Sequence, residues 1–160
     1  MHGVVDGDAS AAARIREGLD ELATTGTIVG GPFFMSLLAE AQWRRGDSAG
    51  ALETLQEALA FSESHESPYW VPELLRLEGE LRSSDGDTQT ALALFERAGE
   101  SARAQGAHLL ELRAATSAGR LLADQGRADE ARARVEPLLS VLAGAGVCQD
   151  VAAARELLGP

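Results

Sequence analysis

Lysine is absent from this 160-residue sequence, and cysteine and aromatic residues are scarce. The 14 strongly basic residues are therefore all arginines, which excludes the lysine of a phosphate-binding loop and a Schiff-base lysine. The single cysteine, Cys148, cannot form an internal disulfide and is typical of a reducing compartment, so we expect a cytoplasmic protein. Because aromatic residues make up only 4%, the core must be built from alanine, leucine and valine, which favours helices over a sheet.

The charge balance and the lack of long apolar runs exclude several classes of partner. A net charge of −11 repels phosphate backbones, so we expect no direct contact with nucleic acid. We find no basic and apolar leader at the start and no stretch of about 18 apolar residues, so we expect neither a signal peptide nor a membrane span. The lysine-free, alanine- and arginine-rich composition favours a GC-rich bacterial genome.

Glycine turns recur at an interval of 40 residues, at Gly46, Gly86 and Gly126. Seven residues before each of these glycines lies a small residue, which is Ala39, Gly79 or Gly119. Five residues after each glycine lies an alanine, at positions 51, 91 and 131. Nine residues after each glycine lies an apolar residue, which is Leu55, Phe95 or Val135. Glycine readily ends a helix, and Asp47 or Asp87, or the Ser or Thr after it, can cap the next one. The pattern predicts antiparallel helical hairpins.

The apolar spacing between the turns predicts where each helix begins and ends. We expect helices at about 9–24, 33–45, 48–63, 70–83, 88–104, 109–125, 128–143 and 149–158, with loops at 25–32, 66–69, 106 and 144–147. The period extends back to Ala11, Ile15 and Gly18, which indicates an incomplete earlier unit. The prediction is a single solenoid over 1–160, with an incomplete unit at 1–30, hairpins at 31–70, 71–110 and 111–146, and a C-terminal capping helix at 147–160.

Two stretches carry a likeness to known proteins: YWVPELLRLEGEL at 69–81, and residues 98–136, which include SARAQGA at 101–107 and ELRAATS at 111–117. The repeat resembles tetratricopeptide repeats, which implies an all-α, right-handed superhelix of antiparallel hairpins. The stretches resemble the C-terminal helical-repeat region of large bacterial signalling ATPases, often joined to adenylate cyclase-type or LuxR-type DNA-binding domains. The likeness extends to the closing segment at 147–158. It implies a regulatory arm that binds a partner, senses a ligand or restrains an ATPase core, and it brings no catalytic residues with it.

Residue types that carry chemistry occur in this sequence without the spacing that chemistry needs. The glycine-rich segment at 24–31 lacks the Gly-Lys-Ser/Thr ending of a phosphate loop. His2, His65 and His108 stand far apart, which disfavours a zinc site. We therefore predict no catalytic, cofactor-binding or metal-binding residues, and a protein that is not an enzyme.

The residues expected to bind a partner lie on the first helix of each hairpin, which faces the concave surface of such solenoids. Helical spacing places them on one face, and stacking of the units would bring Glu40, Glu80 and Arg120 into one row. The predicted partner-binding groove consists of Phe33, Ser36, Glu40, Trp43, Arg44, Glu73, Arg76, Glu80, Arg113, Thr116 and Arg120. Mixed charge suits a peptide or a helix of another protein. Alternatively, the charged residues pair with one another across adjacent helices.

Tyr69 and Trp70 stand beside two prolines at the start of an expected helix. They either form a hydrophobic staple or plug between units, or anchor a partner, because tyrosine and tryptophan are enriched at the centres of interfaces.

The predicted function is a non-catalytic protein-interaction and regulatory module. Two alternatives stay open. The first is a small-molecule sensor, in which Trp43, Arg76, Arg113 and Arg120 hold an anionic effector. The second is a self-association module, because an apolar stripe at Ile15, Leu19 and Leu22 lacks its expected partner helix and could be covered in a homodimer.

Overall fold

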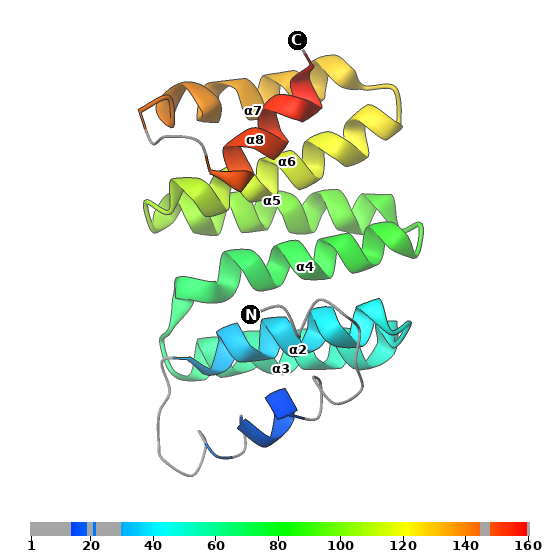
Figure 1. Ribbon diagram of the computed structural model, residues 1–160, viewed down its shortest axis with the longest axis vertical. Helices are drawn as coiled ribbons and strands as arrows, with labels where there is room; N and C mark the ends of the chain where they lie inside the picture. Colours follow the sequence, from blue (N-terminus) through cyan, green and yellow to red (C-terminus); the bar gives the residue numbers. More distant parts are fainter. Residues whose placement is uncertain (1–13, 19–20, 22–29, 145–147, 160) are drawn as a thin grey trace. The chain divides into compact units, whose positions relative to one another are not determined.

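The computed structural model describes residues 14–18, 21, 30–144 and 148–159, and within these ranges it contains helices and turns but no strand. The short segment at 14–18 is helical. The longer elements are α2 (Gly31–Arg44), α3 (Ser48–Ser64), the 3-10 helix η1 (Pro68–Trp70), α4 (Val71–Ser84), α5 (Thr88–Ala104), α6 (His108–Asp124), α7 (Ala128–Val141) and α8 (Gln149–Leu158). Figure 1 labels helices α2 to α8 and colours them along the sequence. The all-α prediction is confirmed.

The glycine turns have the geometry that the 40-residue period predicts. Gly46, Gly86 and Gly126 have φ angles of 83°, 85° and 77°, in the left-handed region that favours glycine. The residue after each glycine donates its N–H to the carbonyl five residues before it, at 2.9–3.0 Å. This bond closes the end of the helix and reverses the chain. Two of the following helices begin with the expected cap, because Asp47 accepts from the Gly50 N–H and Asp87 from the Thr90 N–H.

Most helix boundaries fall within two residues of the prediction, and the differences have local causes. Helix α2 begins at Gly31 instead of 33, because Pro32 fits the first turn of a helix, where its missing N–H has no partner to lose. Part of the expected loop at 66–69 is the 3-10 helix η1. Residues 25–29 and 145–147 of the expected loops, and most of the expected helix at 9–24, lie outside the described residues.

The chain divides into two compact units, Met1–Leu77 and Glu78–Pro160. In the first unit α2 packs on α3, and Leu38 and Ala41 of α2 form a small core with Ile15. The helix at 14–18 is therefore in contact with α2, and Leu19 and Leu22 of the expected stripe lie outside the described residues. The division into hairpins at 31–70, 71–110 and 111–146 within one solenoid stays a prediction.

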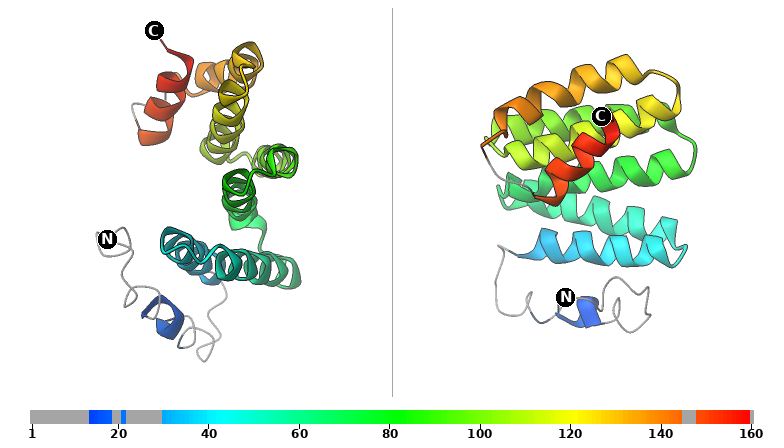
Figure 2. Two further views of the ribbon diagram at one scale, coloured as in Figure 1. Left: turned by 90° about the vertical axis from the view of Figure 1, so that its right-hand side faces the viewer. Right: turned by 45° about the horizontal axis from the view of Figure 1, so that its top comes forward.

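In the second unit α6 packs against α5, α7 and α8. One core cluster joins α5 to α6 through Phe95 and Ala118, and another joins α6, α7 and α8 through Leu112, Val135 and Val151. Figures 1 and 2 show α8 lying across α6 and α7. The small and apolar positions of the repeat are buried, with Ala51, Leu55, Ala91 and Val135 each 0% exposed. These positions therefore form the helix crossings, as the period predicts.

Candidate functional site

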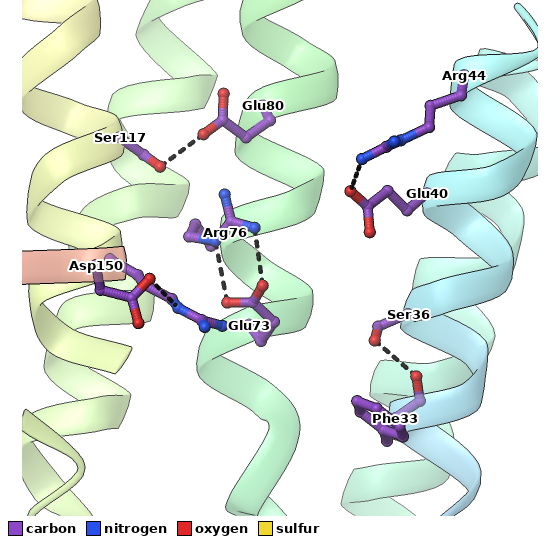
Figure 3. A network of polar contacts seen from close by, with 10 residues as sticks. Phe33, Ser36, Glu40, Arg44, Glu73, Arg76, Glu80, Ser117 and Asp150 are labelled. Carbon is purple, nitrogen blue, oxygen red and sulfur yellow. Dashed lines mark hydrogen bonds and ion pairs between the residues drawn. The ribbon is translucent and has the colours of Figure 1, made fainter. Parts of the chain in front are cut away.

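The predicted groove residues of the first unit are largely occupied by contacts within their own helices. Arg44 donates to Glu40 at 2.7 Å, and the Ser36 hydroxyl donates to the backbone carbonyl of Phe33 at 2.7 Å (Figure 3). Ser36 is 5% exposed, so its hydroxyl offers a partner little surface. Trp43 is half-buried on the same helix. The carboxylate and guanidinium on this face already neutralise each other.

Glu73 and Arg76, one helical turn apart on α4, form a bidentate ion pair. Arg76 donates through Nε at 3.0 Å and through a terminal nitrogen at 2.8 Å (Figure 3). Both side chains are mostly shielded, with exposed fractions of 18% for Arg76 and 13% for Glu73. Parallel hydrogen bonds of this kind fix the guanidinium plane, so an anionic ligand would have to displace a carboxylate already in place.

In the second unit the predicted residues are divided between internal contacts and solvent. Glu80 of α4 accepts a hydrogen bond from Ser117 of α6 at 2.6 Å (Figure 3). Thr116 is 4% exposed and its hydroxyl donates to the Leu112 carbonyl. Arg120 is exposed. Of these three residues, Arg120 is the one whose side chain is open to a partner.

Helix α8 covers part of the face that was expected to bind a partner on α6. Arg113 of α6 donates through Nε to the Asp150 carboxylate of α8 at 2.8 Å. A Cβ on Gly119 would lie 2.7 Å from Cδ2 of Leu157, which shows how closely α8 approaches α6 there. Helix α8 is the C-terminal helix that was predicted to cap the chain. Its residues Asp150 and Leu157 lie against α6 beside Arg113 and Gly119.

Aromatic side chains cluster at one end of the first unit. The Trp70 ring lies 4.8 Å from the Phe33 ring, and Tyr69 and Phe34 extend the cluster with ring-centroid distances of 5.1 Å to Trp70 and 5.4 Å to Phe33. Tyr69 is 60% exposed and Phe34 39%. Trp70 therefore packs onto the start of α2, a different helix from the one that it precedes, whereas Tyr69 remains open to solvent.

The second unit contains a groove that the sequence reasoning missed. It has a volume of about 450 Å³ and runs between α5 and α7, with α6 as its floor. The prediction had placed the binding surface on the first helix of each hairpin, whereas both walls here are second helices. The floor and lower walls are apolar or small, formed by Phe95, Gly99, Ala114, Ala115, Ala118 and Leu138.

Charged residues line the rim of this α5–α7 groove. Arg134 of α7 reaches across to Glu96 of α5 at 2.9 Å, with both side chains partly exposed. Arg103 of α5 donates to Glu111 of α6 at 2.8 Å, and Glu111 is only 4% exposed. Glu100 completes the rim on α5. The groove thus combines an apolar floor with charged walls, an arrangement that suits a ligand with apolar and charged groups.

Neither a metal site nor a membrane span is found in the part of the chain that the structure describes. Within residues 14–18, 21, 30–144 and 148–159, no three His, Cys, Asp or Glu side chains come together in a way that could hold a metal ion. His2 lies outside these ranges. Across the same residues, no helix combines the length and apolarity needed to cross a bilayer.

The helices and turns define the chain as a helical-hairpin repeat protein. A family model of the tetratricopeptide repeat matches residues 32–57 and 112–137, which cover α2 with part of α3, and α6 with most of α7. The two matches begin two periods of 40 residues apart, so the predicted tetratricopeptide-like repeats are confirmed. Such repeats generally mediate protein–protein interactions, which indicates a protein-interaction module.

A curated relative extends the comparison. The chain is 34% identical over 109 residues to an uncharacterized protein of Rhizobium meliloti (strain 1021). The match covers 68% of this chain and 11% of the relative, so the chain spans about a tenth of the length of that protein. From these shares the relative is on the order of 1,000 residues long.

Proposed function

We propose that this chain is a non-catalytic protein-interaction and regulatory segment of a larger bacterial signalling protein, an ATPase or a LuxR-type transcription regulator in the cytoplasm. In this role its hairpins bind a protein partner or another domain of the parent protein. The acidic surface disfavours direct contact with nucleic acid, so any effect on transcription passes through protein contacts.

The observation that carries the interaction role is the open α5–α7 groove on a rigid helical scaffold. Its walls belong to two helices held by the buried core around α6, so the groove is preformed and needs little ordering on binding. The groove offers apolar surface, which contributes affinity, beside charged groups, which orient the bound partner. This combination is typical of a site for a folded segment of another protein.

Two observations support the proposal that the chain belongs to a larger regulator. The stretches at 69–81 and 98–136 resemble the helical-repeat region of signalling ATPases, and the Rhizobium relative is several times longer than this chain. A segment of this kind would act as an arm that binds or restrains neighbouring domains.

The structure gives less support to the two alternative functions. An anionic effector held by Arg76 and Arg113 would have to displace Glu73 and Asp150 from their ion pairs. A homodimer through the stripe at Ile15 would compete with the contact that Ile15 already makes with α2. We therefore place protein interaction first.

Site-specific photo-crosslinking in the native host tests the interaction role. A photoreactive amino acid replaces Glu100 in the groove, Arg120 on the predicted face, or Glu136 on the exposed side of α7 as a control. We expect one protein to crosslink from Glu100 or Arg120 and not from Glu136. Equal crosslinking from all three positions would contradict the proposal.

The genomic reading frame around this segment tests the regulatory role. We expect an ATPase, cyclase or DNA-binding module in the same frame. If such a module is present, deletion of residues 31–158 should change its activity. A frame that encodes only these helices, or a parent protein unaffected by the deletion, would overturn the regulatory part and leave the interaction role standing.

A further inference from the structure

Gly99 lies at a position of the 40-residue repeat where the neighbouring repeats have leucine. Counting 40 residues backwards and forwards from it gives Leu59 and Leu139. Both leucines are half-buried, and Leu139 packs against the core cluster of α6, α7 and α8. Gly99 lies instead on the wall of the α5–α7 groove. The middle repeat thus lacks the side chain that its neighbours use for packing.

Neither backbone conformation nor close packing requires glycine at position 99. Gly99 does not have a positive φ, in contrast to the turn glycines. A Cβ built on it would meet no atom within 4 Å, whereas a Cβ on Gly79 would lie 2.5 Å from the Phe95 ring. Glycine inside a helix is unfavourable relative to alanine, so its presence here is not explained by the fold. It does keep the groove open.

The charges around Gly99 indicate what the groove can accept. Three carboxylates line it, on Glu96, Glu100 and Glu111, against two guanidiniums, on Arg103 and Arg134. Both guanidiniums are bound by carboxylates: Arg134 by Glu96 and Arg103 by Glu111. The groove is therefore lined by one carboxylate more than it has guanidiniums. Glu100, next to Gly99, is the carboxylate that belongs to neither of these two ion pairs. The net charge of −11 adds to the attraction for a cation.

We infer that the α5–α7 groove binds a cationic amphipathic helix of a partner protein, an inference that rests on the proposed interaction role. Small or aliphatic side chains of that helix pack on Gly99, Ala115 and Leu138, which line the groove and are half-buried, and a lysine or arginine reaches Glu100. A volume of about 450 Å³ accepts a few side chains and not a whole helix, whose diameter is about 10 Å. The partner helix therefore lies along the rim and inserts side chains spaced three or four residues apart.

A display selection of amphipathic helices against the full 160-residue chain tests this inference. Selected peptides are measured against the wild type, Gly99→Leu, which places the leucine of the other repeats in the groove, and Glu100→Arg. Matched controls are Ala93→Leu, at an exposed small residue of α5 that does not line the groove, and Glu136→Arg, at an exposed carboxylate of α7 that does not line it either. We expect cationic peptides whose affinity falls about tenfold or more in each groove variant and stays within about twofold in each control.

The outcomes separate this inference from the proposed function. Peptides that bind but do not respond to Gly99→Leu or Glu100→Arg would overturn the groove inference and leave the interaction role intact. Anionic or neutral peptides that are lost in Gly99→Leu would overturn the cationic partner. A third outcome is that no peptide is selected, while a small molecule raises the melting temperature of the wild type and not of Gly99→Leu. This result would assign the groove to a small-molecule effector, and it would count against both the helix-binding inference and the proposed interaction role. Circular dichroism of each variant shows that it has folded.

Discussion

The ring of Phe95 lies directly against the backbone of Gly79, so closely that a methyl group on Gly79 would come within 2.5 Å of Cε1 of the ring. Phe95 is 2% exposed, so a shift of its ring would disturb the core packed around it. This contact is where α4 and α5 cross, and it explains why the small position of the repeat is glycine here and not alanine.

The first prediction follows from this contact. Gly79→Ala should lower the free energy of unfolding by about 1–3 kcal/mol through overpacking, measured by urea denaturation. Gly119→Ala, one period later, is the matched comparison, because its Cβ would meet the end of the flexible Leu157 side chain. We expect Gly119→Ala to cost less. An equal loss in both variants would show that the Phe95 ring can give way.

The second prediction concerns the glycine of the groove. Gly99→Ala should raise the free energy of unfolding by about 0.5–1 kcal/mol, because alanine is the better helix residue and its Cβ enters open space. Gly86→Ala, at a turn with φ of 85°, should instead lower it. Destabilisation by Gly99→Ala would mean that the fold itself needs this glycine.

The third prediction concerns Glu66, whose φ of 50° makes it the non-glycine residue with a positive φ in the described ranges. One period later the same turn position is Gly106, with φ of 67°. Glu66→Gly should therefore stabilise the protein by up to about 1 kcal/mol, the approximate cost of a left-handed conformation for a residue with a Cβ. Thermal and chemical denaturation measure the gain. Gly106→Glu, the converse change, should be destabilising, and a neutral result for both would contradict the argument.

The fourth prediction concerns Glu111, the shielded carboxylate among the lining residues of the α5–α7 groove. Arg103 donates to Glu111, and Arg103→Met removes this partner while keeping the aliphatic part of the side chain. We expect a loss of about 1–2 kcal/mol, at the low end for a hydrogen bond to a charged group, because Arg103 is 68% exposed. Arg97→Met, elsewhere on α5, is the control and should change stability little. Equal effects would show that Arg103 contributes no more than an exposed charge.

The fifth prediction is a pH dependence at the start of α5. Hydrogen bonding from the Thr90 side chain and then from its backbone N–H lowers the pKa of Asp87 below its ordinary value of 3.8. Because the pKa is lower in the folded state, the stabilisation is fully present above 3.8 and disappears as the pH falls through the folded-state pKa.

Asp87→Asn keeps a capping side chain but removes the titration. The stability difference between wild type and Asp87→Asn should therefore shrink as the pH falls below about 3.8, as followed by thermal denaturation. Asp85→Asn, at an exposed residue that is not the N-cap, corrects for the general effect of one lost charge. A difference that stays constant with pH would contradict the role of the Asp87 charge.

The helices could be predicted from the sequence because their ends depend on local interactions. Gly46, Gly86 and Gly126 each end a helix through contacts within six residues, so their spacing alone placed the turns. The start of α2 was predicted two residues late, because Pro32 is compatible with both a loop and a first helical turn.

The candidate sites were harder to predict, because they depend on contacts between helices. Spacing placed Arg113 on the predicted partner-binding face of α6, but only the fold brings Asp150, 37 residues later, into contact with it. The α5–α7 groove left one trace in the sequence, the glycine at position 99 between Leu59 and Leu139 in the period. That difference becomes informative once the structure shows that no neighbouring atom fills the gap.

The aromatic cluster in the first unit gives the protein a built-in optical probe. Both tryptophans, Trp43 and Trp70, and the only tyrosine, Tyr69, belong to the unit that ends at Leu77, and Phe95 is the one aromatic residue after it. Intrinsic fluorescence therefore reports on the first unit alone, whereas far-ultraviolet circular dichroism reports on the helices of both. Overlaying the two signals during denaturation shows whether the units melt together or in turn, without any added label.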